Sequence, residues 1–148
     1  MTRLFFNPFT GRYFTIIVKR KQRKAPSDAR VEALRAQAKE ELPPRLAELA
    51  ALHGFSYNRV SIKNNISNWG SCSVRGNINL NLRLVTLPPA LRDYVILHEL
   101  CHLRHMNHGP QFHALLEQLC PGHRALAREL KGYKISSVGA ITPSNGND

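Results

Sequence analysis

A segment in the second half of the chain is apolar on nearly every side, yet it carries three ionisable residues. Residues 94–103 read Tyr-Val-Ile-Leu-His-Glu-Leu-Cys-His-Leu. A helix that is apolar all round is expected to be buried. Burying Glu99 together with His98 and His102 costs several kcal/mol unless another group satisfies them. This conflict is the first indication of a functional site.

The spacing His-Glu-x-x-His within this segment is typical of a metal site. His98 and His102 are four residues apart, so a helix places both rings on one face, one turn apart. Two imidazoles in that arrangement can bind one Zn²⁺ ion. Glu99 lies about 100° farther around the helix axis. In that position Glu99 is suited to act as a general base on a metal-bound water, and it is not placed to be a metal ligand itself.

A catalytic zinc site needs a third protein ligand and an open fourth position. His108 follows His102 by six residues, and Gly109-Pro110 comes directly after it. We expect the helix to end near His105 and the chain to turn there. Asn107 can make that turn in the left-handed conformation, which asparagine tolerates. His108 would then return to the metal as the third ligand.

The other candidate side chains have simpler interpretations. His105 is predicted to be a surface residue, with a substitute ligand or a proton donor as alternatives, and His113 to be partly buried or to line a cleft. Cys101 is expected to be a small buried side chain that faces away from the metal. Cys72 stays open as an alternative ligand. The competing interpretation of the whole motif is a surface helix with two exposed histidines and a solvated glutamate.

Length and composition favour one globular domain that works in a reducing environment. The chain has 148 residues, of which 43% are hydrophobic and 21% charged, which is enough for one core. No apolar run reaches the roughly 18 residues that span a bilayer, and the N-terminus lacks the apolar region of a secretory signal. We therefore expect no membrane association. The three cysteines form no CxxC pair, which argues against a disulfide framework and for a cytoplasmic location.

The pattern along the chain predicts an α+β fold. We expect a single domain over residues 1–138 and a flexible tail at 139–148, where small polar residues show no core pattern. Residues 1–24 are predicted to form a hairpin followed by a basic run. Residues 25–54 are predicted to form two helices, because Pro43-Pro44 interrupts the helical periodicity.

The rest of the domain is predicted to begin with strands and to continue with helices. Residues 57–84 suggest three strands in an antiparallel meander. Among them, Asn77–Leu82 alternates polar and apolar residues, as a half-buried strand does. Residues 88–138 are expected to hold the metal-binding helix, which opens at Pro88-Pro89 and runs for roughly sixteen residues. Two further helices are predicted, at Pro110–Leu119 and His123–Lys131.

A longer series of ordered residues surrounds the helix motif between residues 57 and 120. It comprises Trp69-Gly70-Ser71-Cys72, Gly76-x-Ile78-x-Leu80-Asn81, Pro88, Tyr94-Val95, His98 to Leu103, and Asn107-His108-Gly109-Pro110-x-Phe112. This series resembles the YgjP-like metallopeptidase domain, a family of small bacterial zincins related to the SprT type. The chain departs from that family at His113, where the family often has tryptophan, and in a shortened N-terminal β region.

The resemblance implies a fold, a metal site and an activity. The implied fold is a compact zincin-like core, with a small antiparallel sheet packed on the helices, including the HExxH active-site helix. In that family, the histidines that correspond to His98, His102 and His108 bind zinc, and the glutamate that corresponds to Glu99 is the catalytic base. The implied activity is that of a zinc metallopeptidase that acts on peptides or proteins, with one Zn²⁺ per chain.

The expected reaction is hydrolysis of a peptide bond by a metal-activated water. Glu99 would take the proton of that water and pass it to the leaving amine. Tyr94, His105 and Asn107 are the candidates for stabilising the oxyanion. The strand that contains Asn79 is expected to be an edge strand that either pairs with extended substrate or serves only as part of the sheet.

Two other functions remain open. Of the net charge of +11, residues 1–63 carry 13 lysines and arginines against 5 acids, whereas residues 64–148 carry 8 against 5. The basic N-terminal region is therefore a candidate docking surface for DNA or another polyanion, and SprT-type relatives are linked with proteolysis of DNA-bound proteins. The third interpretation is a metal-dependent hydrolase of a nucleotide, although no glycine-rich phosphate loop supports it.

Overall fold

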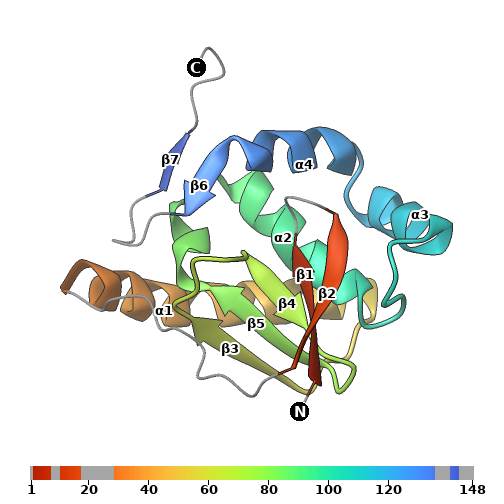
Figure 1. Cartoon of the computed structure of the whole chain (residues 1–148), viewed down its shortest axis with the longest axis horizontal. Helices are drawn as coiled ribbons and strands as arrows, with labels where there is room; N and C mark the ends of the chain where they lie inside the picture. The colour runs from red at the N-terminus through yellow and green to blue at the C-terminus, as the bar shows by residue number, and fades with distance from the viewer. Residues whose placement is uncertain (1, 8–10, 18–28, 136–140, 144–148) are drawn as a thin grey trace.

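The computed structural model describes residues 2–7, 11–17, 29–135 and 141–143. These residues form a mixed α+β structure of helices and three small sheets (Figure 1). The helices are α1 (Ala29–His53), the 3₁₀ helix η1 (Leu82–Thr86), α2 (Pro89–Cys101), α3 (Pro110–Leu119) and α4 (His123–Lys131). The strands are β1 (Thr2–Asn7), β2 (Arg12–Ile17), β3 (Arg59–Lys63), β4 (Gly70–Cys72), β5 (Asn77–Asn81), β6 (Tyr133–Ile135) and β7 (Ile141–Pro143).

The central sheet has the strand order β3–β5–β4, which corrects two expectations. β5 pairs in parallel with β3 and antiparallel with β4, so the sheet is not an antiparallel meander. The reason is that residues 64–69 carry the chain from β3 to the far side of β5 before β4 begins (Figure 1). β5 is also not an edge strand. Asn79 lies opposite Ser61 on one side and Ser71 on the other, so the backbone of β5 is already paired and cannot receive a substrate strand.

The break that the sequence predicts at Pro43-Pro44 is wrong, because α1 runs through both prolines. A proline inside a helix removes a backbone hydrogen bond and clashes with the preceding turn, at a cost of about 3 kcal/mol. The apolar face of α1 nevertheless continues across this point, with Leu42 buried before the prolines and Leu46 and Leu49 buried after them. Packing of this face, which includes contacts with η1, outweighs the local preference.

α2 is buried along most of its length and packs against α1, α3, α4 and β4. It opens at the predicted prolines but has 13 residues instead of roughly sixteen. After Cys101 the backbone tightens, because the N–H groups of His102, Leu103 and Arg104 bond to carbonyls three residues earlier. No described residue other than glycine has a positive φ, so the left-handed turn expected at Asn107 is wrong and the tightened turn takes its place.

The predicted bounds of α3 and α4 are found in the structure, and so is the N-terminal hairpin. β1 and β2 pair antiparallel, and β1 lies beside β4 (Figure 1). The basic run at residues 19–24 lies outside the described residues. At the other end, β6 and β7 form an antiparallel pair that was not predicted. Ile141–Pro143, which fall within the predicted tail, pair with β6, and the other residues of that tail lie outside the described residues.

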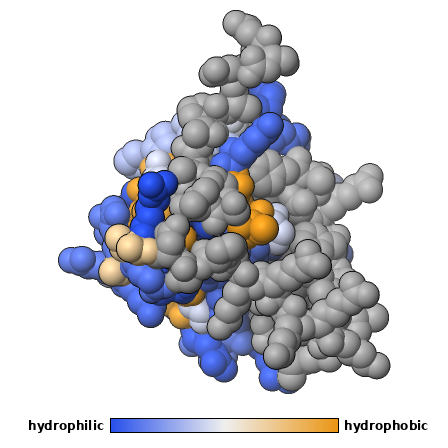
Figure 2. All heavy atoms as spheres, turned by 60° about the vertical axis from the view of Figure 1, so that its left-hand side comes forward, coloured by the Kyte–Doolittle hydropathy of each residue, from blue (hydrophilic) through white to orange (hydrophobic). Residues whose placement is uncertain are grey.

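Apolar side chains of the described residues are mostly buried. The large hydrophobic residues that are exposed among them are Leu52, Ile66 and Val74. Figure 2 accordingly shows the hydrophobic colour only in small patches among hydrophilic residues on the face it presents. Within the described part of the chain, no helix combines the length and apolar character needed to cross a membrane.

Candidate metal centre

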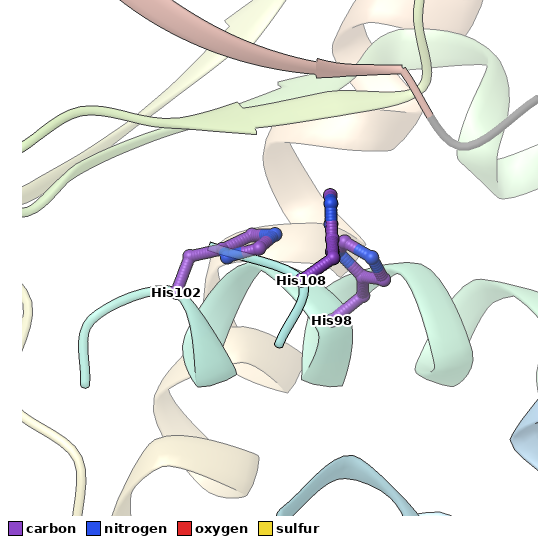
Figure 3. Close-up of side chains that lie close together, drawn as sticks. All are labelled: His98, His102 and His108. Atoms are coloured by element: carbon purple, nitrogen blue, oxygen red, sulfur yellow. The ribbon is translucent and has the colours of Figure 1, made fainter. Parts of the chain in front are cut away.

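Three imidazoles converge beside α2. His98 lies in α2, His102 caps the C-terminal end of that helix, and His108 lies in the loop before α3. Their rings point toward a common space (Figure 3), and their candidate ligand atoms all lie within 4.8 Å of one another. His98 and His102 are buried and His108 is half-buried. The structure thus brings together the three residues that the sequence proposes as ligands.

The end of α2 orients the ring of His102. The tightened turn after Cys101 carries the chain around so that the backbone carbonyl of His105 lies 2.9 Å from Nδ1 of His102. Nδ1–H donates to this carbonyl in the tautomer that leaves the Nε2 lone pair for a metal, an arrangement found behind most metal-binding histidines. His105 therefore contributes its main chain here, a role that residue type alone does not reveal.

Phe112 forms an apolar wall for all three histidines. Its ring stacks on His102 at a centroid distance of 4.4 Å, and it lies at 4.9 Å from His98 and 4.8 Å from His108. The side chain is fully buried at the start of α3. It holds the rings in place and excludes water from one side of the cluster. The sequence places Phe112 only in the series of residues that carries the family resemblance and predicts no role for it.

Burial keeps the three histidines uncharged. It lowers the pKa of His98 well below its usual value and lowers that of His102 to about 2. The pKa of His108 falls to about 4 through burial and the nearby His113, although a backbone hydrogen bond with Gly11 works in the opposite direction. That bond also places the β1–β2 hairpin next to the cluster. Neutral imidazole is the form that binds metal ions, so the site is ready for one at neutral pH.

Glu99 is the one buried carboxylate next to this cluster in the described part of the chain. Its side chain is 1% exposed, and Oε1 lies 3.5 Å from Nδ1 of His98. Burial raises its pKa well above the usual value. Oε2 has no hydrogen-bond partner among the described residues. An unsatisfied buried carboxyl oxygen is costly in a purely structural role, which points to a functional one.

Gly70 is a site residue whose role the sequence does not predict. It opens β4, and a Cβ built on it would lie 3.2 Å from Cγ of Glu99 and 3.2 Å from the carbonyl oxygen of Asn79. Glycine lets β4 approach Glu99 this closely, because any other side chain would require the carboxylate or the strand to shift by a few tenths of an ångström. The available signal was an isolated glycine inside a strand pattern, which often marks a close backbone approach.

The other candidate residues differ in their burial and in their contacts. Tyr94 is buried with its ring edge-on to His98 at 5.9 Å, and burial raises its pKa, which keeps the phenol protonated. The amide of Asn79 donates to the hydroxyl of Ser71 within the central sheet. His105 is half-buried and Asn107 is exposed, and both line a groove next to Phe112.

The cysteines are poor metal ligands in this structure. Cys72 and Cys101 are buried, and neither belongs to the group of potential ligands found among the described residues. Burial raises the pKa of both thiols, whereas the thiolate is the form that binds metals. The alternative in which Cys72 is a ligand therefore has no support from the geometry.

A comparison with known families bears on this arrangement. Residues 9–133 match the family described as YgjP-like, metallopeptidase domain. The chain belongs to this family. No curated protein and no solved structure matches the chain. The YgjP-like region includes α1, the central sheet and α2 to α4, and with them Glu99 and the three clustered histidines. Membership in a metallopeptidase family indicates a metal-dependent peptidase.

Proposed function

We propose that this YgjP-like chain is a zinc peptidase of the zincin type, in which His98, His102 and His108 hold one Zn²⁺ ion and Glu99 is the general base. The observation that carries the proposal is a buried carboxylate beside three convergent, uncharged imidazoles. Buried ionisable groups in such a cluster are costly to the fold, and a catalytic metal site accounts for all of them together.

The residues fit a zinc ion. Zinc in catalytic sites takes three protein ligands, often imidazole nitrogens at about 2.0–2.1 Å, and leaves a fourth position open. The candidate nitrogens lie within 4.8 Å of one another, close enough for modest side-chain movement to bring them around one ion. His102 has the supporting carbonyl expected behind such a ligand. No fourth histidine, cysteine or acid among the described residues belongs to this group.

The proposed reaction assigns Glu99 two successive tasks. A bound zinc ion would act as a Lewis acid and lower the pKa of a water molecule bound to it to about 7. Glu99 takes the proton from the attacking water and then gives it to the leaving amine. Burial strengthens Glu99 as a base because it raises the pKa of the carboxyl group. Gly70 and Phe112 keep the carboxylate and the rings in fixed positions, which preserves the reacting geometry.

His105 and Asn107 are the proposed oxyanion donors. They line a groove next to Phe112, so a substrate bound across the cluster can reach them. Tyr94 is less accessible because only 3% of it is exposed. The amide of Asn79 is already engaged with Ser71 in the sheet, so it is not a substrate contact in this proposal.

Three variants test the metal site and the base separately. The purified protein should contain about one zinc per chain and hydrolyse unstructured protein substrates. Glu99→Gln should keep the zinc but lose hydrolysis by at least about a hundredfold. His98→Ala and His108→Ala should each lose zinc. Atomic emission measures the zinc content, and cleavage of a fluorescent casein measures the hydrolysis. Full zinc content in both histidine variants would contradict the site.

A second proposal concerns polyanions and rests on the basic excess in residues 1–63. We propose that this region is a docking surface for DNA or another polyanion, and that the protein works in the cytoplasm. Electrostatic binding of this kind weakens steeply with salt. Retention on heparin at about 50 mM salt, and its loss when Lys19, Arg20 and Lys21 are replaced by alanine, would support the surface. No retention at low salt would exclude it.

A further inference from the structure

A groove between α3 and α4 begins next to the proposed metal centre. Its walls include His113 and Glu117 from α3 and His123, Arg124 and Arg128 from α4. The ring of His113 lies 6.3 Å from that of His108, so the groove and the histidine cluster are neighbours. The groove encloses about 650 Å³, a size within the usual range for ligand sites of roughly 300–1,000 Å³.

A chain of hydrogen bonds holds one wall of this groove in place. The carboxylate of Glu117 accepts from the backbone N–H of Gly122 at 3.0 Å and from Nδ1–H of His123 at 2.5 Å. Nε2 of His123 is then the acceptor for Nδ1–H of His113, at 3.3 Å. Through these contacts the carboxylate of Glu117 is already hydrogen-bonded, and α3 is connected to α4. The groove therefore has a fixed shape, and its one carboxylate is already engaged.

Two arginines on the α4 side of the groove have no acidic partner among the described residues. Arg124 and Arg128 are one turn apart on α4, so they share a face of the helix, and both line the groove. Within the described part of the chain, neither forms an ion pair, whereas Arg35, Arg45 and Arg92 do. A rigid groove with two unengaged guanidinium groups favours a negatively charged ligand, because guanidinium binds carboxylates in a two-pronged geometry.

We propose that this groove is a substrate subsite in which Arg124 and Arg128 bind an acidic side chain of the peptide. The inference rests on the proposed peptidase function, since the occupant of the groove would be part of the chain that crosses the metal centre. A peptide fits better than a nucleic acid, because the groove lies beside the site of peptide hydrolysis and its described lining offers no aromatic platform besides two histidines. The subsite would make the enzyme prefer substrates with a glutamate or aspartate near the cleaved bond.

Binding measured without turnover tests this subsite directly. The probe is a pair of fluorescein-labelled, alanine-rich octapeptides, one with two adjacent glutamates and one with two glutamines in their place. The protein is the full chain with Glu99→Gln, loaded with zinc, so that neither peptide is cut. We expect the glutamate peptide to bind roughly three- to tenfold more tightly, as measured by fluorescence anisotropy.

Two further double variants separate the groove from general charge. Arg124→Glu with Arg128→Glu should abolish or reverse the preference for the glutamate peptide. If this charge-reversed protein does not fold, the milder pair Arg124→Gln with Arg128→Gln replaces it and should abolish the preference. Arg30→Glu with Lys39→Glu is the matched control, because it changes the net charge equally at exposed positions of α1. The control should keep the preference of the parent.

The outcomes distinguish this inference from the proposed function. Equal affinities for the two peptides, no measurable binding of either, or the same loss in the control and groove variants would each overturn the subsite. Displacement of the glutamate peptide by a single-stranded oligonucleotide of equal charge, at lower concentration than by unlabelled peptide, would assign the groove to nucleic acid instead. Absence of zinc, or of hydrolysis by the wild-type chain, would overturn the peptidase proposal while leaving the glutamate-over-glutamine comparison interpretable.

Discussion

Glu99 and Gly70 depend on each other although they are 29 positions apart in the sequence. The glutamate is buried in α2, where one oxygen of its carboxyl group has no hydrogen-bond partner among the described residues. The glycine lets β4 lie against that side chain without a steric clash. The residue type that looks least informative in the Trp-Gly-Ser-Cys stretch therefore determines where the proposed base can sit.

Gly70→Ala tests this dependence. The added methyl group would lie 3.2 Å from Cγ of Glu99 and from a backbone carbonyl, so the carboxylate must move by a few tenths of an ångström. We expect zinc content to stay unchanged and kcat to fall roughly tenfold, since small misplacements of a catalytic group are costly. Steady-state cleavage of a fluorogenic peptide measures this.

Gly109→Ala is the matched control for that experiment. No atom lies within 4 Å of a Cβ built on Gly109, and its φ of −80° suits alanine. Activity close to that of the wild type is expected. An unaffected Gly70→Ala enzyme would mean that Glu99 has room to move or does not act as the base.

At the scale of elements, the corner between α3 and α4 is held by a side chain as well as by the backbone. α4 begins after Gly122, whose φ of 79° is in the left-handed region that favours glycine. Glu117, in the last turn of α3, reaches across to the N–H of Gly122 and to His123. This corner sets the angle between the two helices and so shapes the groove beside the metal centre.

The pH dependence of stability should reveal this contact. The bond from the backbone N–H of Gly122, and then that from His123, lower the pKa of Glu117 in the folded state. A lowered carboxyl pKa adds stability above its unfolded value of 4.5, and this stability is lost as the pH falls through the folded value. Glu117→Gln should therefore lower Tm by about 2 °C at pH 7 and by less at pH 3. Thermal unfolding followed by circular dichroism measures both values.

Glu129→Gln provides the comparison at the same two pH values. Glu129 is exposed on α4 and has no hydrogen bond or ion pair with another described side chain. Its replacement should leave Tm nearly unchanged at pH 7. If Glu117→Gln lowered Tm equally at pH 3 and pH 7, the stabilisation would not come from the ionised carboxylate.

At the scale of the whole molecule, α2 connects the layers. It packs on α1, on β4 and on the two C-terminal helices, and its own end carries two of the three clustered histidines. The third histidine lies in the loop that leads to α3. A metal ion bound by all three would therefore tie the central helix to the C-terminal helices, in addition to any chemistry it supports.

Metal removal should consequently destabilise the entire fold. A ligand that binds only the folded state at a thousand times its Kd adds about 4 kcal/mol, which corresponds to roughly 8–16 °C in Tm for a chain of this length. We expect a strong chelator to lower Tm by that order and zinc to restore it, as measured by differential scanning fluorimetry. His98→Ala with His108→Ala should show no response to either addition. If neither chelator nor zinc changed the Tm of the wild-type protein, a metal ion would not connect the central helix to the C-terminal helices.

Local patterns in the sequence account for a large part of the fold. The apolar periodicity of residues 94–103 predicts a buried helix, and α2 is buried. The prolines and Gly122 set the ends of α3 and α4 where they were predicted, and the family resemblance is confirmed over residues 9–133. The helices and their ends depend on groups within a few residues of one another, because helix periodicity, capping and turn formation are short-range effects.

Contacts between distant segments decided the remaining features. The parallel pairing of β3 with β5, which leaves β5 in the centre of the sheet, depends on a loop that crosses the sheet. α1 continues through Pro43-Pro44 because its buried face has partners elsewhere in the chain. The close approach of Gly70 to Glu99 likewise joins separate elements. No local stretch of sequence contains both partners of such a contact, so only the tertiary packing that brings the partners together determines these features.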